Sequence, residues 1–151
     1  MTILTAEYED LQGILELQHL AFQREAEQYN DFLIQPLKQT IYGIRKEFEK
    51  YVFLKATDDN GNIIGSVRGY VNDRTSYVST LIVHPNLQGR GIGTQLLLTI
   101  ESLCPASRYE IFSSIRCPLN IKLYECLGYV KFREIQTQNN GFVYLEKYFT
   151  K

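Results

Sequence analysis

The fold of this chain is decided by the stretch Val83-His84-Pro85-Asn86-Leu87-Gln88-Gly89-Arg90-Gly91-Ile92-Gly93-Thr94. The apolar run that ends at Val83 predicts a buried strand, and Pro85 ends that strand. Apolar residues then recur at the spacing of an amphipathic helix, at Ile92, Leu96, Ile100 and Leu103. The glycines therefore fall at a helix start, where unpaired N–H groups carry partial positive charge and glycine lets the backbone approach a ligand. This combination predicts an anion site of the kind that holds a pyrophosphate.

The spacing Gln88-x-x-Gly91-x-Gly93 after such a strand resembles the acyl-CoA-binding motif of the GNAT superfamily of N-acetyltransferases. In that family the loop amides hold the CoA pyrophosphate, so the resemblance implies CoA contacts at Gln88, Gly89, Arg90, Gly91, Ile92, Gly93 and Thr94. The preceding strand segment of the family pairs its backbone with the pantetheine arm, a role that falls here on Leu81, Ile82 and Val83. A P-loop or a dinucleotide fingerprint fits less well, because the first ends in Gly-Lys-Ser/Thr and the second reads GxGxxG. The motif alone leaves open an ordinary glycine-rich turn.

A second segment, from Cys117 to Tyr129, predicts a short helix with both ends marked. Pro118 suits the first helical position, and Gly128 suits the left-handed residue just past the end. We expect Asn120 and Tyr124, four residues apart, to share a face that can turn toward a cleft. The core stripe of this helix is expected to be Leu119, Leu123 and Leu127.

The pattern Asn-x-x-x-Tyr-x-x-x-Gly-Tyr in this segment resembles the GNAT segment that follows the strand after the CoA helix. In that family the tyrosine lies near the acetyl-CoA sulfur, which implies that Tyr124 protonates the departing CoA thiolate, as a phenol of pKa about 10 can. The alternative for Tyr124 is a ring that only packs. Asn120 either contacts CoA or bonds to the start of its own helix. Many GNAT sequences carry Asn or Ser where this chain has Cys117, and we assign that cysteine no chemistry.

The general base does not follow from the resemblance. Some family members place a glutamate on the strand before the glycine loop, but the run from Ser79 to Val83 holds no carboxylate. Glu110, on the following strand, is the nearest carboxylate in sequence to the expected cleft and is our candidate base. The alternatives to Glu110 as the base are a water chain and an acceptor amine of low pKa. The alternative for Glu110 itself is a solvated charge at the end of a strand.

Acceptor choice is expected to reside in the acidic and aromatic stretch from Phe22 to Phe32. Glu25, Glu27 and Asp31 would attract a cationic amine while Tyr29 or Phe32 stacks on it, which favours a polyamine, an aminoglycoside or a lysine-like acceptor. The alternative for this charge run is a solvated surface.

The remaining elements follow from periodicity and turn residues. We expect an N-terminal amphipathic helix with Leu11, Ile14, Leu15 and Phe22 facing inward, a helix over 37–50, and hairpin turns at Asp58-Asp59-Asn60-Gly61 and Asn139-Asn140-Gly141. Strands are predicted over 2–6, 51–57, 63–71, 76–83, 109–113, 129–136 and 141–147. This order predicts a mixed sheet with one right-handed parallel crossover. The resemblance implies an α/β fold with a GNAT-like mixed, mostly antiparallel central sheet of about six or seven strands, flanked by about four helices.

Composition limits the class of protein. The 151 residues, 44% of them hydrophobic, fit a single domain spanning 1–151, and a net charge of -1 without a basic run argues against nucleic acid or an anionic membrane as partner. No apolar stretch reaches membrane-spanning length and the N-terminus lacks a signal-peptide pattern, so we expect a cytoplasmic protein. The 3 cysteines and 2 histidines show no metal-ligand spacing, so we expect reduced thiols and no metal.

The resemblance implies an N-acetyltransferase that moves an acetyl group from acetyl-CoA to a primary amine of a small molecule or peptide by direct attack. The alternative is a non-catalytic acyl-CoA-binding sensor or scaffold. GNAT members share a fold and differ in assembly, so a homodimer is among the arrangements that the resemblance allows.

Overall fold

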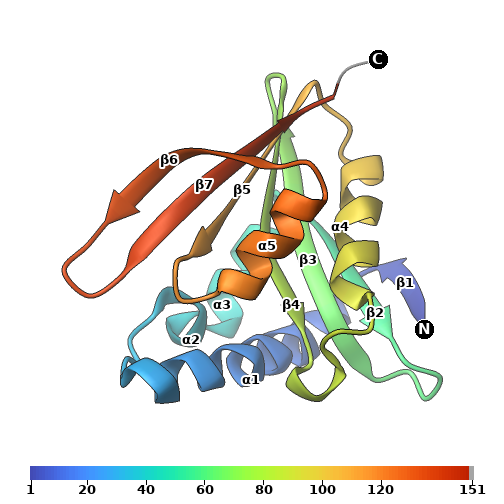
Figure 1. The fold of residues 1–151 in the computed structure, drawn as a ribbon. Helices are drawn as coiled ribbons and strands as arrows, with labels where there is room; N and C mark the ends of the chain where they lie inside the picture. Colours follow the sequence, from blue (N-terminus) through green and yellow to red (C-terminus); the bar gives the residue numbers. More distant parts are fainter. Residues whose placement is uncertain (150–151) are drawn as a thin grey trace.

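One mixed sheet runs through the computed structural model, which describes residues 1–149. Its strands are β1 (Thr2–Thr5), β2 (Val52–Thr57), β3 (Ile63–Asn72), β4 (Thr75–Val83), β5 (Arg108–Ser114), β6 (Val130–Gln136) and β7 (Gly141–Tyr148). They form a 7-stranded sheet in the order β1-β2-β3-β4-β5-β7-β6, and every neighbouring pair is antiparallel except β4 and β5 (Figure 1). The predicted mixed, mostly antiparallel sheet is confirmed.

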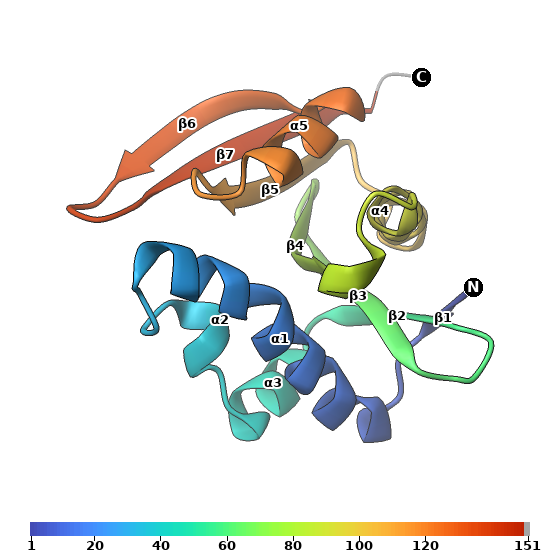
Figure 2. The same ribbon diagram turned by 60° about the horizontal axis from the view of Figure 1, so that its bottom comes forward.

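The helices cover the sheet from both sides. They are α1 (Leu11–Tyr29), α2 (Gln35–Lys38), α3 (Ile41–Phe48), α4 (Ile92–Leu103) and α5 (Pro118–Cys126), with short 3-10 turns η1 (Tyr8–Asp10) and η2 (Pro85–Leu87). Helices α1 and α3 bury Ile14 and Ile44 against Phe53 of β2. Helix α4 buries Leu96 and Ile100 in a separate cluster on the opposite face, so the central strands lie between two layers (Figure 2).

The predicted helix over 37–50 is wrong in one respect, because it is broken into α2 and α3. Gln39 adopts an extended backbone, and Thr40 caps α3 by accepting a hydrogen bond on its hydroxyl from the Gly43 N–H at 3.3 Å. A threonine at this position satisfies an otherwise unpaired donor at the helix start. The continuing apolar periodicity concealed this break.

The predicted apolar stripe of α5 is also partly wrong. Ile121 and Tyr124 are the buried residues of this helix, whereas Leu119 is 74% exposed and lies on the first turn, beside a groove rather than in the core. Leu103 of α4 is likewise exposed, and Phe22 of α1 is only half-buried. The helices are therefore placed correctly by periodicity, while their rotation depends on the neighbouring layer.

A wedge opens between β4 and β5. These strands pair only from Thr75 to Tyr77, and beyond that point β5 pairs with β7 while β4 keeps only β3 as a neighbour. A bulge in β4 assists this separation, since Thr80 has φ 51° and the register with β3 shifts opposite it. The edge of β4 from Leu81 to Val83 therefore faces the gap, and the two halves of the sheet diverge in Figure 2.

Arg68 of β3 fastens the N-terminal helices to the sheet. Its side chain is 2% exposed and lies 4.7 Å from the centre of the Phe53 ring. The guanidinium donates hydrogen bonds to Gln18 of α1 and to Glu47 of α3, and a further one to Gln39 at 3.2 Å. Burial lowers the pKa of this guanidinium and the Glu47 carboxylate opposes that shift, so the group stays charged. The α1 wall of the wedge is thereby held in a fixed position.

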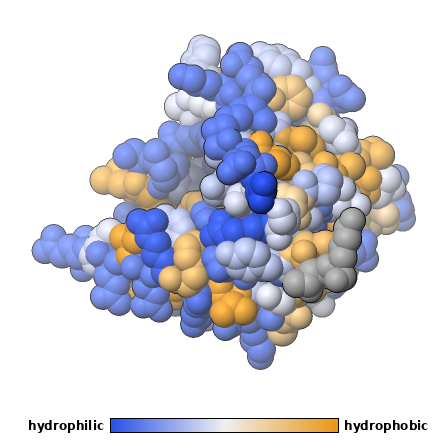
Figure 3. Space-filling model, turned by 90° about the horizontal axis from the view of Figure 1, so that it is seen from above, coloured by the Kyte–Doolittle hydropathy of each residue, from blue (hydrophilic) through white to orange (hydrophobic). Residues whose placement is uncertain are grey.

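Figure 3 shows the surface from the end with the β3–β4 hairpin. Hydrophobic side chains form separate patches among hydrophilic ones in that view (Figure 3). Among residues 1–149, none of the helices has the length and apolar character needed to cross a membrane.

Candidate active site

The glycine loop forms an open backbone cradle between η2 and α4. Gly89 and Gly91 have φ values of 78° and 81°, the left-handed region that favours glycine, and Gly91 is the N-cap of α4. In the first backbone hydrogen bond of the helix, the Gln95 N–H donates to the Gly91 carbonyl at 3.1 Å. Within residues 1–149, no backbone N–H from Gln88 to Thr94 donates to a backbone carbonyl. These N–H groups are free to bind an anion.

The cradle opens into a groove of about 810 Å³. One wall is the second half of α1, the other is the start of α5, and the exposed edge of β4 forms the floor between them. Ten of the predicted cofactor-binding residues line it, namely Leu81, Ile82, Val83, Gln88, Gly89, Gly91, Ile92, Gly93, Thr94 and Asn120. Segments that lie far apart in the sequence thus meet along one continuous surface.

The shape and donors of this groove fit an acyl-CoA. A Cβ built on Gly89 or Gly91 would meet nothing within 4 Å, so the space above the free amides can take a phosphate. Beside the cradle, a Cβ on Gly93 would lie 3.4 Å from Leu123 and close to Leu81 and Val83, so apolar side chains surround this part of the groove lining. An anion cradle beside an apolar part of the groove matches a pyrophosphate followed by a pantetheine arm.

Two predicted cofactor residues lie off the groove lining. Arg90 is exposed at the tip of the loop. Tyr124 is 3% exposed, packs its ring 6.2 Å from that of Tyr129, and has no hydrogen-bond partner among the described residues. Burial, together with the nearby Cys117 thiol, raises the pKa of the Tyr124 phenol, so the hydroxyl stays protonated.

Opposite Tyr124, a group of polar side chains joins α1 to the start of α5. The Cys117 thiol donates to Glu25 Oε1 at 3.2 Å, and Arg116 lies 3.0 Å from Asp31 and 3.8 Å from Glu25. The Arg116 guanidinium also stacks over the Tyr29 ring at 4.6 Å. Arg116 could not be identified from the sequence, because nothing in its local pattern shows that α1 lies beside it.

The predicted acceptor residues are therefore divided. Glu25 and Tyr29 line the groove, whereas Glu27, Asp31 and Phe32 lie outside its lining. Asp31 is paired with Arg116. The positive charge of Arg116 offsets the acidity that the sequence suggested for this wall. The prediction that Glu25 and Tyr29 contact the acceptor stays a prediction.

Glu110 does not reach the groove. It lies opposite Tyr77 in the part of β5 that is still paired with β4, and its carboxylate is bound to Arg108 at 2.9 Å. The groove lies beyond the point where the two strands separate, and Glu110 is not among its lining residues. The proposed base is corrected for this reason.

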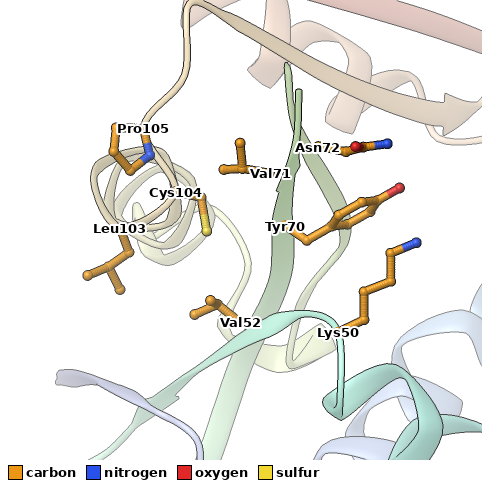
Figure 4. A pocket seen from close by; sticks show the side chains of 8 residues that line it. All are labelled: Lys50, Val52, Tyr70, Val71, Asn72, Leu103, Cys104 and Pro105. Atoms are coloured by element: carbon orange, nitrogen blue, oxygen red, sulfur yellow. The ribbon is translucent and has the colours of Figure 1, made fainter. Parts of the chain in front are cut away.

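A second cavity of about 500 Å³ lies at the outer end of β3. Lys50, Tyr70 and Asn72 lie on one side of the strand and Leu103, Cys104 and Pro105 on the other (Figure 4). It contains no residue of the glycine loop or of α5, so it is separate from the candidate site.

The cysteines should react at different rates with a thiol reagent. Burial and the Glu25 carboxylate raise the pKa of Cys117 to about 12, burial raises the pKa of Cys104, and Cys126 is exposed. Since the thiolate is the reactive form, we expect one fast thiol per chain at pH 8, removed by Cys126→Ser. Dithionitrobenzoate titration of the native protein measures this, and a fast phase that persists in Cys126→Ser would contradict the described burial.

Known proteins show where this architecture occurs. The model of the acetyltransferase (GNAT) family matches residues 11–146. The PaiA N-acetyltransferase of Thermoplasma acidophilum, solved with coenzyme A, superposes with a TM-score of 0.77 at 16% identity, covering 98% of each chain. A phosphinothricin acetyltransferase of Sinorhizobium meliloti, solved with acetyl-CoA, gives 0.79 at 17% identity over 97% of this chain and 87% of that one. A ribosomal-protein-alanine N-acetyltransferase of Brucella melitensis gives 0.75 at 16% identity over 99% and 100%.

At these identities the structural similarity shows the fold, whereas the family match spans most of the sequence. The match includes the glycine cradle, the open edge of β4 and the whole of α5. The chain therefore belongs to the GNAT acetyltransferase family and is an acetyl-CoA-dependent acyltransferase.

Proposed function

We propose that this enzyme transfers the acetyl group of acetyl-CoA to a primary amine of a small molecule or peptide by direct attack. The observation that carries the proposal is the continuous groove, which joins the free amides of the glycine cradle to the α1 wall. When bound, acetyl-CoA supplies the thioester carbonyl that the amine attacks. The protein supplies an anion site, a backbone edge, a proton donor and a surface for the acceptor.

Binding is assigned to backbone groups. The N–H groups from Gly89 to Thr94 hold the pyrophosphate, and the open edge from Leu81 to Val83 pairs with the amides of the pantetheine arm. Arg90 contributes through its backbone, since its side chain is exposed at the loop tip. Asn120 lines the groove from α5 and supplies a side-chain amide to the cofactor.

Tyr124 is proposed as the general acid that protonates the leaving sulfur. Its burial keeps the hydroxyl protonated but also makes it a weaker acid than a phenol in water. The same desolvation raises the proton affinity of a thiolate expelled beside it, so transfer from oxygen to sulfur remains possible.

The acceptor approaches along α1. Phe22 and Tyr29 give this wall an aromatic surface, and the neighbouring Arg116 prevents it from being strongly acidic. Proteins of this fold include one named for spermidine and one named for a ribosomal protein alanine, so the fold leaves the acceptor class open. We therefore propose a primary amine as acceptor. A second positive charge elsewhere in the acceptor molecule is not required.

Release of CoA thiol tests the proposal. Purified protein and acetyl-CoA would be mixed with spermidine, an aminoglycoside, lysine methyl ester, phosphinothricin and an alanine-initiated peptide, with the thiol followed by a chromogenic disulfide. We expect release that depends on both protein and at least one amine, with an acetylated amine of the matching mass. Tight acetyl-CoA binding without release across small amines and peptide N-termini would favour the sensor or scaffold instead.

A further inference from the structure

One carboxylate that lines the groove has no role in cofactor binding or in protonation of the leaving sulfur. Among the described residues that line the groove, Glu25 is the one with an acidic side chain. The strand edge from Ser79 to Val83 provides no carboxylate, and Glu110 is bound to Arg108 away from the groove. A base for the attacking amine must therefore come from the α1 wall or from solvent.

The two oxygens of Glu25 have different surroundings. Oε1 accepts the Cys117 S–H at 3.2 Å, which fixes the orientation of the carboxylate. Oε2 lies 3.8 Å from the Arg116 guanidinium, too far for a hydrogen bond. Two buried side-chain atoms in residues 1–149 lack a hydrogen-bond partner, Arg68 Nε and Ser76 Oγ. Glu25 Oε2 also has no hydrogen-bond partner but is not one of these buried atoms, so it remains accessible. One oxygen is held and the other is available.

Cys117 places this carboxylate next to the proposed acid. Cys117 is the N-cap of α5 and stands seven residues before Tyr124, about two helical turns, so the two residues lie on the same side of the helix. The Cys117 thiol also contributes to the raised pKa of the Tyr124 phenol. Glu25 and Tyr124 therefore face the same side of α5, with Cys117 in contact with Glu25.

We propose that Glu25 is the general base that takes the proton from the attacking amine, with Cys117 and Arg116 as positioning residues. The inference rests on the proposed function. In the balanced step, the amine nitrogen bonds to the acetyl carbon, the carbon–sulfur bond breaks, Glu25 Oε2 takes one N–H proton, and Tyr124 gives its proton to sulfur. Glu25 then loses a proton to solvent and Tyr124 regains one, so the net products are the N-acetyl amine and CoA thiol.

The charged and titratable groups around Glu25 define its pH response. Arg116 and Cys117 face it from the start of α5, while Tyr29 and Asp31 belong to the end of α1 and the loop after it. The Arg116 guanidinium lies closer to Asp31, at 3.0 Å, than to Glu25, and the Cys117 thiol stays protonated. Neither group therefore prevents Glu25 Oε2 from accepting a proton. A reaction that depends on a basic carboxylate loses kcat/KM on the acidic side of its pH profile, which gives the test its second readout.

Glu25→Gln tests the inference with the amine that the wild type accepts. We expect kcat to fall about 100-fold, the acidic limb of the kcat/KM profile to disappear, and the acetyl-CoA Kd to stay within about twofold. Glu25→Asp retains a carboxylate and should recover part of the rate, which separates loss of the base from loss of folding. Glu16→Gln is the matched control, because Glu16 is an exposed glutamate on the same helix outside the groove lining.

The outcomes are distinct. A wild-type kcat in Glu25→Gln, or a rise in the amine KM alone, would overturn the base and leave Glu25 as an acceptor-binding residue at most. A retained acidic limb in Glu25→Gln would also overturn it, because another group would then be titrating. Absence of thiol release from the wild-type protein is a separate result, and it would remove the proposed function together with this role of Glu25.

Discussion

Replacing Gly91 by valine is expected to weaken acetyl-CoA binding by about 4 kcal/mol, roughly a thousandfold in Kd, from the loss of about two charge-assisted N–H bonds. Gly91 has φ 81° at the N-cap of α4, a conformation that a β-branched residue resists. Its added side chain would also project into the open space above the cradle. Isothermal titration of the variant with acetyl-CoA measures the change.

Gly61→Val provides the matched control for that experiment. Gly61 has φ 82° in the β2–β3 hairpin, and a Cβ there also meets nothing within 4 Å, so the backbone strain of about 1–2 kcal/mol is similar. Gly61 lies outside the groove lining, so its variant should lose a similar amount of folding free energy while keeping the wild-type Kd. Wild-type affinity in Gly91→Val, or equal loss in both variants, would contradict the phosphate cradle.

Tyr124→Phe is expected to lower kcat by about 100-fold, the range for removal of a general acid, while the acetyl-CoA Kd stays within about twofold. The separation of effects is expected because Tyr124 is absent from the groove lining, whereas the proposed role of its hydroxyl is to protonate the leaving sulfur. Steady-state thiol release at saturating amine measures kcat, and calorimetry measures binding.

The stability of this variant is informative as well. The Tyr124 hydroxyl has no hydrogen-bond partner within residues 1–149, so its removal should leave the midpoint of urea unfolding nearly unchanged. Tyr144→Phe is the control, since Tyr144 of β7 stacks on Phe112 away from the groove. Equal kcat values for Tyr124→Phe and the wild type would exclude the acid role and leave Tyr124 as a packing residue.

The main features of the fold could be predicted from the sequence because they depend on local signals. Pro85 and Gly91 mark a strand end and a helix start, and Pro118 and Gly128 mark the ends of α5. The break at Thr40 was missed, because a threonine cap inside an apolar periodic stretch is a weak signal. The bulge at Thr80 was also missed, since a β-branched residue in the left-handed region is unusual and only the pairing with β3 reveals it.

The site was predictable where one continuous segment forms it. The cradle residues lie together in sequence and in space, so their motif located them. Glu110 was chosen as a base by its nearness in sequence, but pairing with β4 carries it to the closed end of the wedge. The contact of Cys117 with Glu25 spans 92 residues, and no local pattern signals such a contact. The α1 wall of the groove therefore could not be predicted without knowing that α1 lies beside Arg116 and Cys117.

The most direct test of the account is a pair of calorimetric titrations of the wild-type protein, one with acetyl-CoA and one with S-acetylpantetheine. The two ligands share the thioester and the pantetheine amides and differ in the pyrophosphate and nucleotide. We predict saturable one-to-one binding of acetyl-CoA and an affinity for S-acetylpantetheine at least about 100-fold lower, because the free amides from Gly89 to Thr94 contact only the former. Equal affinities, or no binding of acetyl-CoA, would contradict the assignment of this loop as the pyrophosphate site.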